Sequence, residues 1–336
     1  MLLVGLRDFL LDSTQIDHIL VIQGGVFRGI SVDNAILVVD VGIATEGEFT
    51  VIFAAAQPNG LQEIRKRSVS APGARATKET LFTVDSDQLQ SGIWRRIEEH
   101  SILLSELAFV NFGKQLRDRK KFTRDVIKME SQSQIQLPYR PCYTGRDVER
   151  YAVRWGGLAC LDDAAARKGG CWDPERQNRK QKLLTRQIGK YPAFAMDRLG
   201  YQCLNTMFMI NVRRSGVDSF FLIGILNSAV IRAYWLGRFY DQRRTFPKIK
   251  GTYLEQLPIP RIDEGAEVER VGQVVFLARR MVELHDALGK AMTPTETTVL
   301  QRHIDGMDRQ IDQLVYELYG LTEEEIRIVE EGAQRA

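Results

Sequence analysis

The sequence predicts a mixed α+β protein with part of an α/β sheet first, a strand-rich middle and helices at the carboxy-terminal end. Three observations predict this class: apolar runs near the start, short β-like runs in the middle and a heptad pattern near the end. The chain has 336 residues and 44% hydrophobic content, so we expect two or three domains with cores of their own.

The first sixty residues predict one helix followed by strands. Apolar residues recur at helical spacing through Leu2, Leu6, Phe9, Leu10 and Ile16, and three apolar runs follow at 18–23, 32–41 and 50–56. Residues 36–39 are apolar on consecutive positions, which is typical of a strand buried on both faces. One helix and three strands do not complete an α/β domain, so we expect residues 1–60 to be the end of something larger.

Residues 61–135 change character and predict a linker or connecting region with one helix. Residues 68–77 are rich in Ser, Ala, Gly and basic side chains, as in a loop. Residues 93–107 have helical spacing, so we expect the helix there.

Residues 136–262 predict a β-rich domain that ends in a helix. Short β-like runs, including 193–196 and 206–212, are separated by Gly, Pro and charged turns. Residues 220–240 then predict one continuous helix whose apolar face carries Phe221, Ile225, Ala229 and Trp235.

Residues 263–336 predict a helical hairpin. Apolar residues follow heptad spacing in two series, Val268, Val271, Val275, Ala278 and Val282, and then Ile304, Met307, Ile311, Leu314, Leu318 and Leu321. The segment 292–294, which contains Pro294, breaks the pattern between them. The hairpin is too short for a long coiled coil, and two alternatives stay open: packing on its own domain, or dimerisation.

Charge is unevenly distributed along the chain. The formal net charge is +3, but residues 261–336 hold nine Lys/Arg and sixteen Asp/Glu, which leaves +10 for residues 1–260. A net positive charge on residues 1–260 favours a polyanionic partner, although many proteins that bind no nucleic acid have a similar charge distribution. No apolar run reaches the roughly 18 residues of a membrane helix, and Arg7 and Asp8 interrupt the first apolar stretch, so we expect a cytoplasmic protein.

The cysteines and histidines do not predict a metal site. The four cysteines form no C-x-x-C pair, and the four histidines lie far from them in the sequence. We therefore expect no metal, no disulfide framework and idle or buried thiols.

Four ordered stretches resemble the carboxy-terminal part of the TaqI-like adenine-N6 DNA methyltransferases, which include single-chain type IIG restriction-modification enzymes. They are residues 26–39, with Val-Phe before an apolar run; residues 143–151, with Gly-Arg-Asp-x-x-x-Tyr; residues 182–206, with Lys-Leu-Leu-x-Arg, Asp197 and Asn-Thr; and residues 226–260, with Leu-Asn-Ser, Phe-Pro-Lys-Ile and Leu-Pro-Ile-Pro. The resemblance implies that residues 1–60 end a methyltransferase domain and that 136–262 form a DNA target-recognition domain. It also implies structural roles for Thr144, Gly145, Asp147, Asn227, Phe246, Pro247 and Pro258.

The catalytic motifs of that family are missing from this sequence. The methyltransferases hold a flipped adenine with an Asn/Asp-Pro-Pro-Tyr/Phe loop, and no Pro-Pro dipeptide occurs here. No glycine-rich turn for S-adenosylmethionine is present either. We therefore expect a chain that is inactive alone, with no cofactor of its own: a truncation, a split-gene product or a specificity subunit. S-adenosylmethionine would belong to a catalytic partner or a missing amino-terminal region.

Three basic clusters, at 114–124, 176–190 and 232–250, are the candidate contacts to double-stranded DNA because cations neutralise phosphates. The candidate DNA-binding residues are Lys114, Lys120, Lys121, Arg146, Arg179, Lys180, Lys182, Arg186, Arg238, Tyr240, Arg243, Arg244, Lys248 and Lys250. Arg186, Arg243 and Arg244 could read bases, because arginine can bond a guanine edge at two points.

The sequence therefore predicts DNA target recognition for a modification or restriction-modification system. Two alternatives stay open: a piece of an active adenine methyltransferase, or an interaction protein whose hairpin docks partners as in type I specificity subunits.

Overall fold

We describe the protein from a computed structural model, which describes residues 2–23, 34–57, 59–76, 88–240, 247–262 and 266–334. The chain divides into two compact units. The amino-terminal unit extends to Gln88, and the main unit begins at Leu89 and contains the carboxy-terminal helices. Each unit is described by itself below.

The amino-terminal unit contains one four-stranded sheet. Its elements are α1 (Leu2–Ser13), β1 (Thr14–Gln23), β2 (Asn34–Val41), β3 (Glu48–Gln57), β4 (Gly60–Ser70) and α2 (Ala71–Ala76). The strand order is β2-β1-β3-β4, with β1 and β3 parallel and the other pairs antiparallel. The strands β1, β2 and β3 coincide with the three predicted apolar runs, whereas residues 68–76, predicted as a loop, complete β4 and form α2.

One face of this sheet carries a small core. Its buried side chains come from α1, β1, β3 and α2 and are Leu10, Leu11, Ile16, Ile19, Phe49, Val51, Phe53, Ala71 and Ala74. The hydroxyl of Thr45 donates to the Thr14 carbonyl at 2.6 Å and accepts from the Ile16 nitrogen at 2.9 Å. These bonds hold the segment that enters β3 against the start of β1.

The strand β2 differs from the prediction of a strand buried on both faces. It lies at the edge of the sheet and pairs only with β1 among the described strands. Ile36, Leu37 and Val38 are 49%, 42% and 39% exposed, and Val41 is 79% exposed. An apolar sequence suited to a sheet interior therefore occupies an open edge.

The first half of the main unit consists of short strands and turns. Its elements are α3 (Gln88–Glu99), β5 (Ser101–Leu103), α4 (Leu104–Leu107), β6 (Ala108–Phe112), β7 (Gln115–Leu116), η1 (Thr123–Asp125), β8 (Val126–Lys128), η2 (Gln132–Gln134), β9 (Tyr139–Tyr143), η3 (Gly145–Asp147), β10 (Leu158–Leu161), η4 (Ala164–Ala166) and β11 (Arg167–Gly169). The helix expected at 93–107 is thus α3, which begins earlier and ends at Glu99 before a short strand.

The second half adds the remaining strands and most of the helices. Its elements are α5 (Pro174–Asn178), β12 (Lys182–Arg186), β13 (Phe194–Asp197), β14 (Gln202–Cys203), β15 (Met207–Val212), α6 (Ser219–Leu226), α7 (Ala229–Arg238), α8 (Gly251–Leu254), β16 (Pro258–Pro260), α9 (Ala266–Leu288), α10 (Pro294–Leu318) and α11 (Glu323–Gln334).

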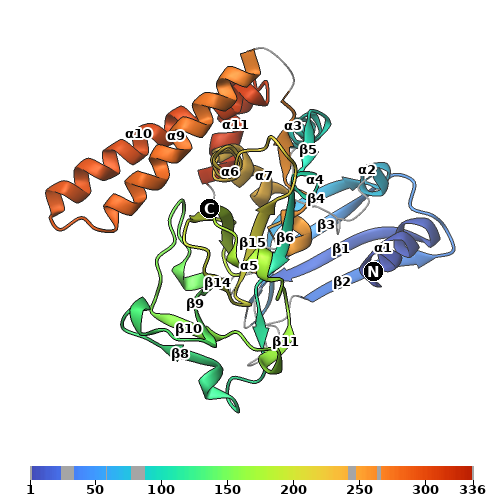
Figure 1. Ribbon diagram of the computed structural model, residues 1–336. Coiled ribbons are helices and arrows are strands. Elements are labelled where there is room, and N and C mark those ends of the chain that lie inside the picture. The colour runs from blue at the N-terminus through green and yellow to red at the C-terminus, as the bar shows by residue number, and fades with distance from the viewer. Residues whose placement is uncertain are drawn as a thin grey trace. The chain divides into compact units, whose positions relative to one another are not determined.

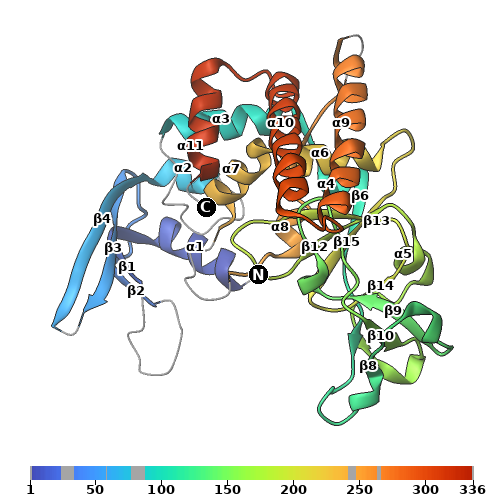
Figure 2. The same ribbon diagram turned by 90° about the vertical axis from the view of Figure 1, so that its left-hand side faces the viewer.

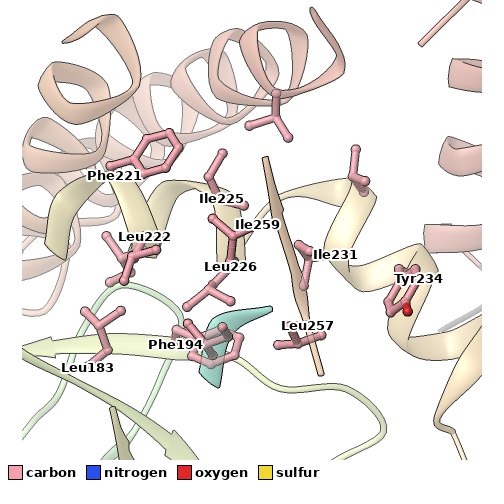
Figure 3. Close-up of a cluster of buried hydrophobic side chains, with 14 of the residues drawn as sticks. Leu183, Phe194, Phe221, Leu222, Ile225, Leu226, Ile231, Tyr234, Leu257 and Ile259 are labelled. Carbon is pink, nitrogen blue, oxygen red and sulfur yellow. The ribbon is translucent and has the colours of Figure 1, made fainter. Parts of the chain in front are cut away.

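The main core lies between an antiparallel sheet and the helices. The sheet has the order β13-β12-β15-β6, and every residue of β13 and β15 is buried. Leu183 and Phe194 from the sheet pack with Leu222, Leu226 and Ile231 from the helices, as Figure 3 shows. Full burial of such side chains contributes roughly 1.5–3 kcal/mol each, so this layer is the main source of stability in the unit.

The prediction of a single helix over residues 220–240 is wrong. The structure has two helices, α6 and α7, whose axes differ by 57° across Asn227 and Ser228. The Asn227 side chain accepts from the Phe194 nitrogen and donates to the Phe194 carbonyl, both at 2.9 Å. The Ser228 hydroxyl caps the first turn of α7. No single helix among those described is long and apolar enough to cross a bilayer, although α6 and α7 together reach that composition.

The helices α9 and α10 form the predicted hairpin and lie side by side in Figures 1 and 2. Ala278 and Val282 of α9 and Ile304 and Ile311 of α10 belong to the main core. The hairpin therefore packs on its own domain, and α11, which the sequence analysis did not separate, packs against α7. The predicted α+β class and helical end of the chain are confirmed.

A second four-stranded sheet, of order β14-β9-β10-β8, lies on the far side of the central sheet from the hairpin in both views. Its core contains Leu116, Cys142, Cys160, Ala166 and Leu204. This sheet supplies β9, the strand that leads into the Gly-Arg-Asp turn.

Candidate functional site

The turn after β9 carries the Gly-Arg-Asp element. Asp147 Oδ2 accepts from the Thr144 nitrogen at 2.6 Å and from the Thr144 hydroxyl at 2.9 Å, which closes η3. The Gly145 nitrogen donates to the Thr206 hydroxyl at 2.9 Å, and a Cβ on Gly145 would stand 2.5 Å from the Thr206 carbonyl oxygen. Only glycine permits this approach. The turn therefore holds the exposed Arg146 beside the start of β15.

The same sequence element ends in an anchor for the hairpin. Arg150 forms an ion pair with Asp308 of α10 and donates to the Asn227 carbonyl at 2.9 Å. Tyr151 is fully buried with a positive φ of 63°, and its nitrogen donates to the Phe194 carbonyl at 2.8 Å. We did not predict these two structural roles from the sequence, although both residues lie within the quoted motif.

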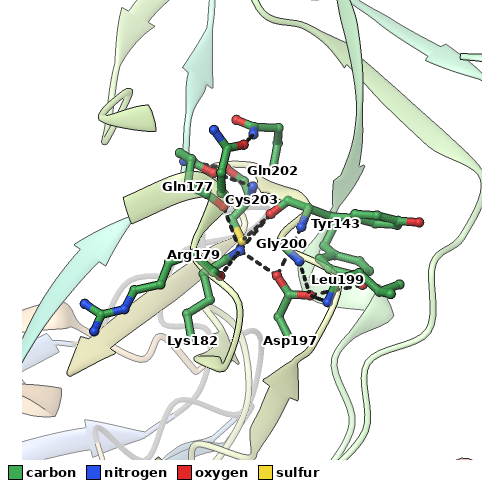
Figure 4. A network of polar contacts seen from close by, with 11 residues as sticks. Tyr143, Gln177, Arg179, Lys182, Asp197, Leu199, Gly200, Gln202 and Cys203 are labelled. Carbon is green, nitrogen blue, oxygen red and sulfur yellow. Dashed lines mark hydrogen bonds and ion pairs between the residues drawn. The ribbon is translucent and has the colours of Figure 1, made fainter. Parts of the chain in front are cut away.

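Lys182, a predicted DNA contact, lies in the protein interior. Its side chain and that of Asp197 are both 0% exposed, and the ammonium and carboxylate are 2.5 Å apart. Figure 4 shows Lys182 between Asp197 and Gln177, and Lys182 Nζ donates to the Gln177 carbonyl at 2.7 Å. It also donates to the Tyr201 carbonyl at 2.9 Å. In this structure Lys182 cannot reach a phosphate, because its ammonium group is buried and bonded to Asp197 and to backbone carbonyls.

Asp197 in turn organises the turn that follows β13. Its carboxylate accepts from the backbone nitrogens of Leu199 at 2.9 Å, Gly200 at 3.1 Å and Tyr201 at 3.1 Å. The Lys-Leu-Leu and Asp parts of the third motif are therefore joined in one structural network. A buried charge without such partners would be costly.

Two further predicted contacts are engaged inside the main unit. Lys114 is 2% exposed, forms an ion pair with Asp162 and lies over the Trp172 ring at 4.6 Å. Arg238 is partly buried and its Nη2 lies 2.7 Å from Glu98 Oε1. Burial and ion pairing make both residues part of the scaffold in this structure.

Five other basic residues come together at a junction of loops, which we call the basic rim: Arg146, Arg186, Lys190, Lys248 and Lys250, all exposed. The Gln187 nitrogen donates to the Thr206 carbonyl at 2.9 Å, and the Ile249 nitrogen donates to the Gln187 carbonyl at 2.8 Å. Ile188 and Lys248 form an isolated β-bridge. Backbone bonds thus join the end of β12 to Thr206 and to the segment before α8, and the bond from Gly145 to the Thr206 hydroxyl adds η3.

The basic rim lacks acidic partners in the part of the chain that the structure describes. No ion pair joins an acidic residue to any of its five members there. Lys250 instead lies over the Tyr253 ring at 4.7 Å and donates to its hydroxyl at 3.2 Å. Unneutralised cations on a shared surface give a positive potential that favours polyanions.

The remaining predicted contacts lie elsewhere or outside the description. Arg179 and Lys180 are exposed in the turn between α5 and β12, and the Arg179 side chain points away from the Lys182 network in Figure 4. Lys120 and Lys121 are exposed in a turn closed by Asp118. Nothing in the described structure brings these four residues to the basic rim.

Three predicted site residues, Arg243, Arg244 and Phe246, lie outside the described residues, as does part of the first motif at 26–33. Tyr240 is partly buried against the main core. The Pro247 carbonyl accepts from the Gly189 nitrogen at 3.0 Å, and the Pro258 carbonyl accepts from the Tyr319 hydroxyl at 2.7 Å. Both prolines thus contribute backbone acceptors to loop and strand contacts.

A buried polar junction joins the hairpin to the rest of the main unit. Asp312 Oδ1 accepts from the Ala229 nitrogen at 2.8 Å, and the His285 and Tyr151 rings are 5.6 Å apart. Burial raises the pKa of Asp312 to about 6. Burial, with the neighbouring Arg150 charge, lowers the pKa of His285 to about 4. The two groups are therefore both biased toward their neutral forms.

The cysteines are all free, with Cys142, Cys160 and Cys203 buried and Cys171 partly buried. Burial raises the pKa of the Cys203 thiol to about 12, so this thiol is held in its protonated form at neutral pH. Among the described residues, no group of three or more His, Cys, Asp or Glu side chains is placed to hold a metal ion.

Residues 140–259 match the model of the TaqI-like C-terminal specificity domain. This range contains η3, the Lys182 network and all five members of the basic rim. The chain therefore carries a TaqI-like specificity domain, as the motifs predicted. No curated protein matches this sequence.

Solved structures of restriction-modification proteins are similar to this chain. The type IIL restriction-modification enzyme MmeI, solved in complex with DNA, has a TM-score of 0.54 at 12% identity and covers 99% of this chain and 47% of its own. The type IIG restriction endonuclease BpuSI has a TM-score of 0.36 at 12% identity, covering 94% of this chain and 45% of its own. An HsdS subunit from Thermoanaerobacter tengcongensis has a TM-score of 0.32 at 12% identity, covering 68% and 50%.

The likeness to MmeI shows a shared fold. The chain spans about half the length of these solved chains.

Proposed function

We propose that this chain recognises a target sequence in double-stranded DNA for a restriction-modification system. The observation that carries the proposal is the basic rim, a set of exposed cations on a TaqI-like specificity domain. Lysine and arginine at such a surface bind phosphates and release counterions, which gives affinity and fixes register, while base contacts give specificity. We also propose the cytoplasmic location that the sequence predicted, since a DNA target suits it.

The structure narrows the residues that we propose to contact DNA. Lys114, Lys182 and Arg238 are left out because they are engaged in internal ion pairs. We retain Arg146, Arg186, Lys248 and Lys250 of the rim and add Lys190. We also retain, as phosphate contacts outside the rim, four exposed residues: Lys120, Lys121, Arg179 and Lys180.

We also propose that methyl transfer is performed by a catalytic methyltransferase partner or region that binds S-adenosylmethionine. The absence of a Pro-Pro dipeptide from the sequence supports this division of labour. Dimerisation through the hairpin stays a prediction; the exposed Val268, Phe276 and Val299 on α9 and α10 are the side chains that it would cover.

The test is DNA binding over a salt series with a random-sequence duplex. We expect binding at low salt, and we expect a Lys248→Ala, Lys250→Ala double variant to bind more weakly. Each lost phosphate contact should reduce the slope of log K against log salt by about 0.9.

The matched control removes the same charge from the hairpin, with Lys290→Ala and Arg302→Ala, both exposed. We expect this variant to keep the wild-type slope. Absence of any affinity at low salt would refute the proposed function, and equal losses in the two double variants would move the DNA surface away from the rim.

A further inference from the structure

Arg186 is the last residue of β12 and lies at the centre of the basic rim. Its backbone is held in the central sheet, where it pairs with Met207 of β15. The Cβ position of Gly145 would be 3.3 Å from Arg186 Cβ, which places η3 against the base of the side chain. The backbone and the Cβ atom of Arg186 are therefore held in place by β12 and by the η3 turn.

The far end of the Arg186 side chain lies on a second glycine. A Cβ on Gly189 would stand 3.1 Å from Arg186 Nε and 3.6 Å from Nη2. The turn that contains Gly189 is itself held in place, because the Gly189 nitrogen donates to the Pro247 carbonyl at 3.0 Å. Because the guanidinium already rests on ordered backbone, less conformational entropy is lost when it binds a ligand.

The chemistry around Arg186 suits the edge of a base pair. No acidic residue forms an ion pair with it among the residues that the structure describes, in contrast to Arg150 and Arg238. Exposed cations flank it at Arg146 and Lys248, and Ile188 adds a 47% exposed apolar side chain. The planar guanidinium of Arg186 can donate two hydrogen bonds to the edge of a base, while the flanking cations bind the phosphates of the DNA backbone.

We propose that Arg186 is a specificity-determining residue that bonds O6 and N7 of one guanine in the major groove. Lysine at the same place could donate to O6 and N7 only through one ammonium nitrogen, without the planar fork that matches both acceptors. The inference rests on the proposed function, since it assigns a base-reading role within that DNA surface.

The test first selects the preferred duplex from a random library and then replaces each guanine of that site, one at a time, by 7-deazaguanine. This analogue lacks the N7 acceptor and keeps the base pair. We expect one position at which the replacement weakens wild-type binding by about tenfold or more, since a two-point contact discriminates by about 10- to 100-fold.

Arg186→Ala should bind the natural site about 10- to 100-fold more weakly and lose its sensitivity to 7-deazaguanine at that position. Arg186→Lys should keep the salt slope and show a reduced sensitivity, because an ammonium lacks the planar fork of the guanidinium. Arg302→Ala is the matched control: it removes an exposed arginine from α10, outside the proposed DNA contacts, and should leave the sensitivity intact.

Two results would overturn the assignment and leave the proposed function standing. In the first, Arg186→Ala binds the selected site with the same response as wild type to every 7-deazaguanine replacement. The variant then differs only in a salt slope that is lower by about 0.9, as expected for a lost phosphate contact. The other is a selected site without guanine. Wild-type protein that binds no DNA at low salt would instead refute the proposed function itself.

Discussion

The strands β2 and β15 have similar apolar sequences and opposite environments. β15 lies between β12 and β6 in the central sheet, and all six of its residues are buried. β2 lies at an edge, and Ile36, Leu37 and Val38 remain well exposed. A run of apolar residues thus indicates that a strand is suited to burial on both faces, whereas the elements that surround it decide whether burial occurs.

The largest effect is expected from the charge inside the central sheet. Replacing Lys182 by Met leaves Asp197 buried without its ionic partner, so the free energy of unfolding should fall by about 3–5 kcal/mol. All four tryptophans lie in the main unit, and denaturant unfolding followed by their fluorescence reports on that unit. Arg179→Met, on the surface, is the control and should change stability by less than about 0.5 kcal/mol. A loss below about 1 kcal/mol for Lys182→Met would contradict the buried network.

Truncating one leucine in each sheet compares the two regions directly. Leu184 in β12 is fully buried, and its replacement by Ala should cost about 2–5 kcal/mol because a cavity remains. Leu37→Ala in β2 should cost less than about 1 kcal/mol, since this side chain is already 42% exposed. Hydrogen exchange of the peptides that cover each strand measures both effects. Equal losses at the two positions would mean that β2 is covered in solution.

A smaller, pH-dependent effect is expected at the hairpin junction. The pKa of Asp312 is raised from 3.8 to about 6, so acidification stabilises the folded state through this group. The pKa of His285 is lowered from 6.5 to about 4, so acidification destabilises the folded state through it. Between about pH 4 and 6 the two contributions oppose each other, and wild-type stability should change little through this pair.

Single variants at the junction should separate the two contributions. Asp312→Asn should lose stability as pH falls from 6.5 to 4, and His285→Gln should gain stability as pH falls from 6 to 4, each by about 1–3 kcal/mol. Thermal unfolding across this pH range measures the slopes. Parallel pH profiles for wild type and both variants would argue against the shifted pKa values.

Local patterns in the sequence predicted several of the longer elements of the fold. The apolar runs gave β1 and β3, and the heptad spacing gave α9 and α10, because these signals depend on periodicity alone. The break between α6 and α7 was missed, since it depends on a bond between Asn227 and Phe194, thirty-three residues away. Periodicity cannot reveal such long-range contacts.

The candidate site was predictable only in part for the same reason. Lys182 and Arg186 lie four residues apart in one basic cluster, yet one is buried on Asp197 and the other is exposed in the basic rim. Charge in a sequence does not show which side chain finds an internal partner. The pairing of Lys182 with Asp197 depends on the register of β12 and β13, which only the folded sheet defines.

The side chain of Asn227 restricts which amino acids its position can accept. It gives one donor and one acceptor to the backbone of a single residue, Phe194, as a neighbouring strand would. Aspartate lacks the donor, leucine lacks both groups, and glutamine carries them one methylene too far. Leucine or glutamine would leave the buried Phe194 nitrogen without this acceptor. Aspartate would keep the acceptor but remove one of the two donors to the Phe194 carbonyl, the other being the Tyr151 nitrogen. In a complete substitution scan, position 227 should therefore tolerate little besides asparagine, even though its side chain touches neither solvent nor the basic rim.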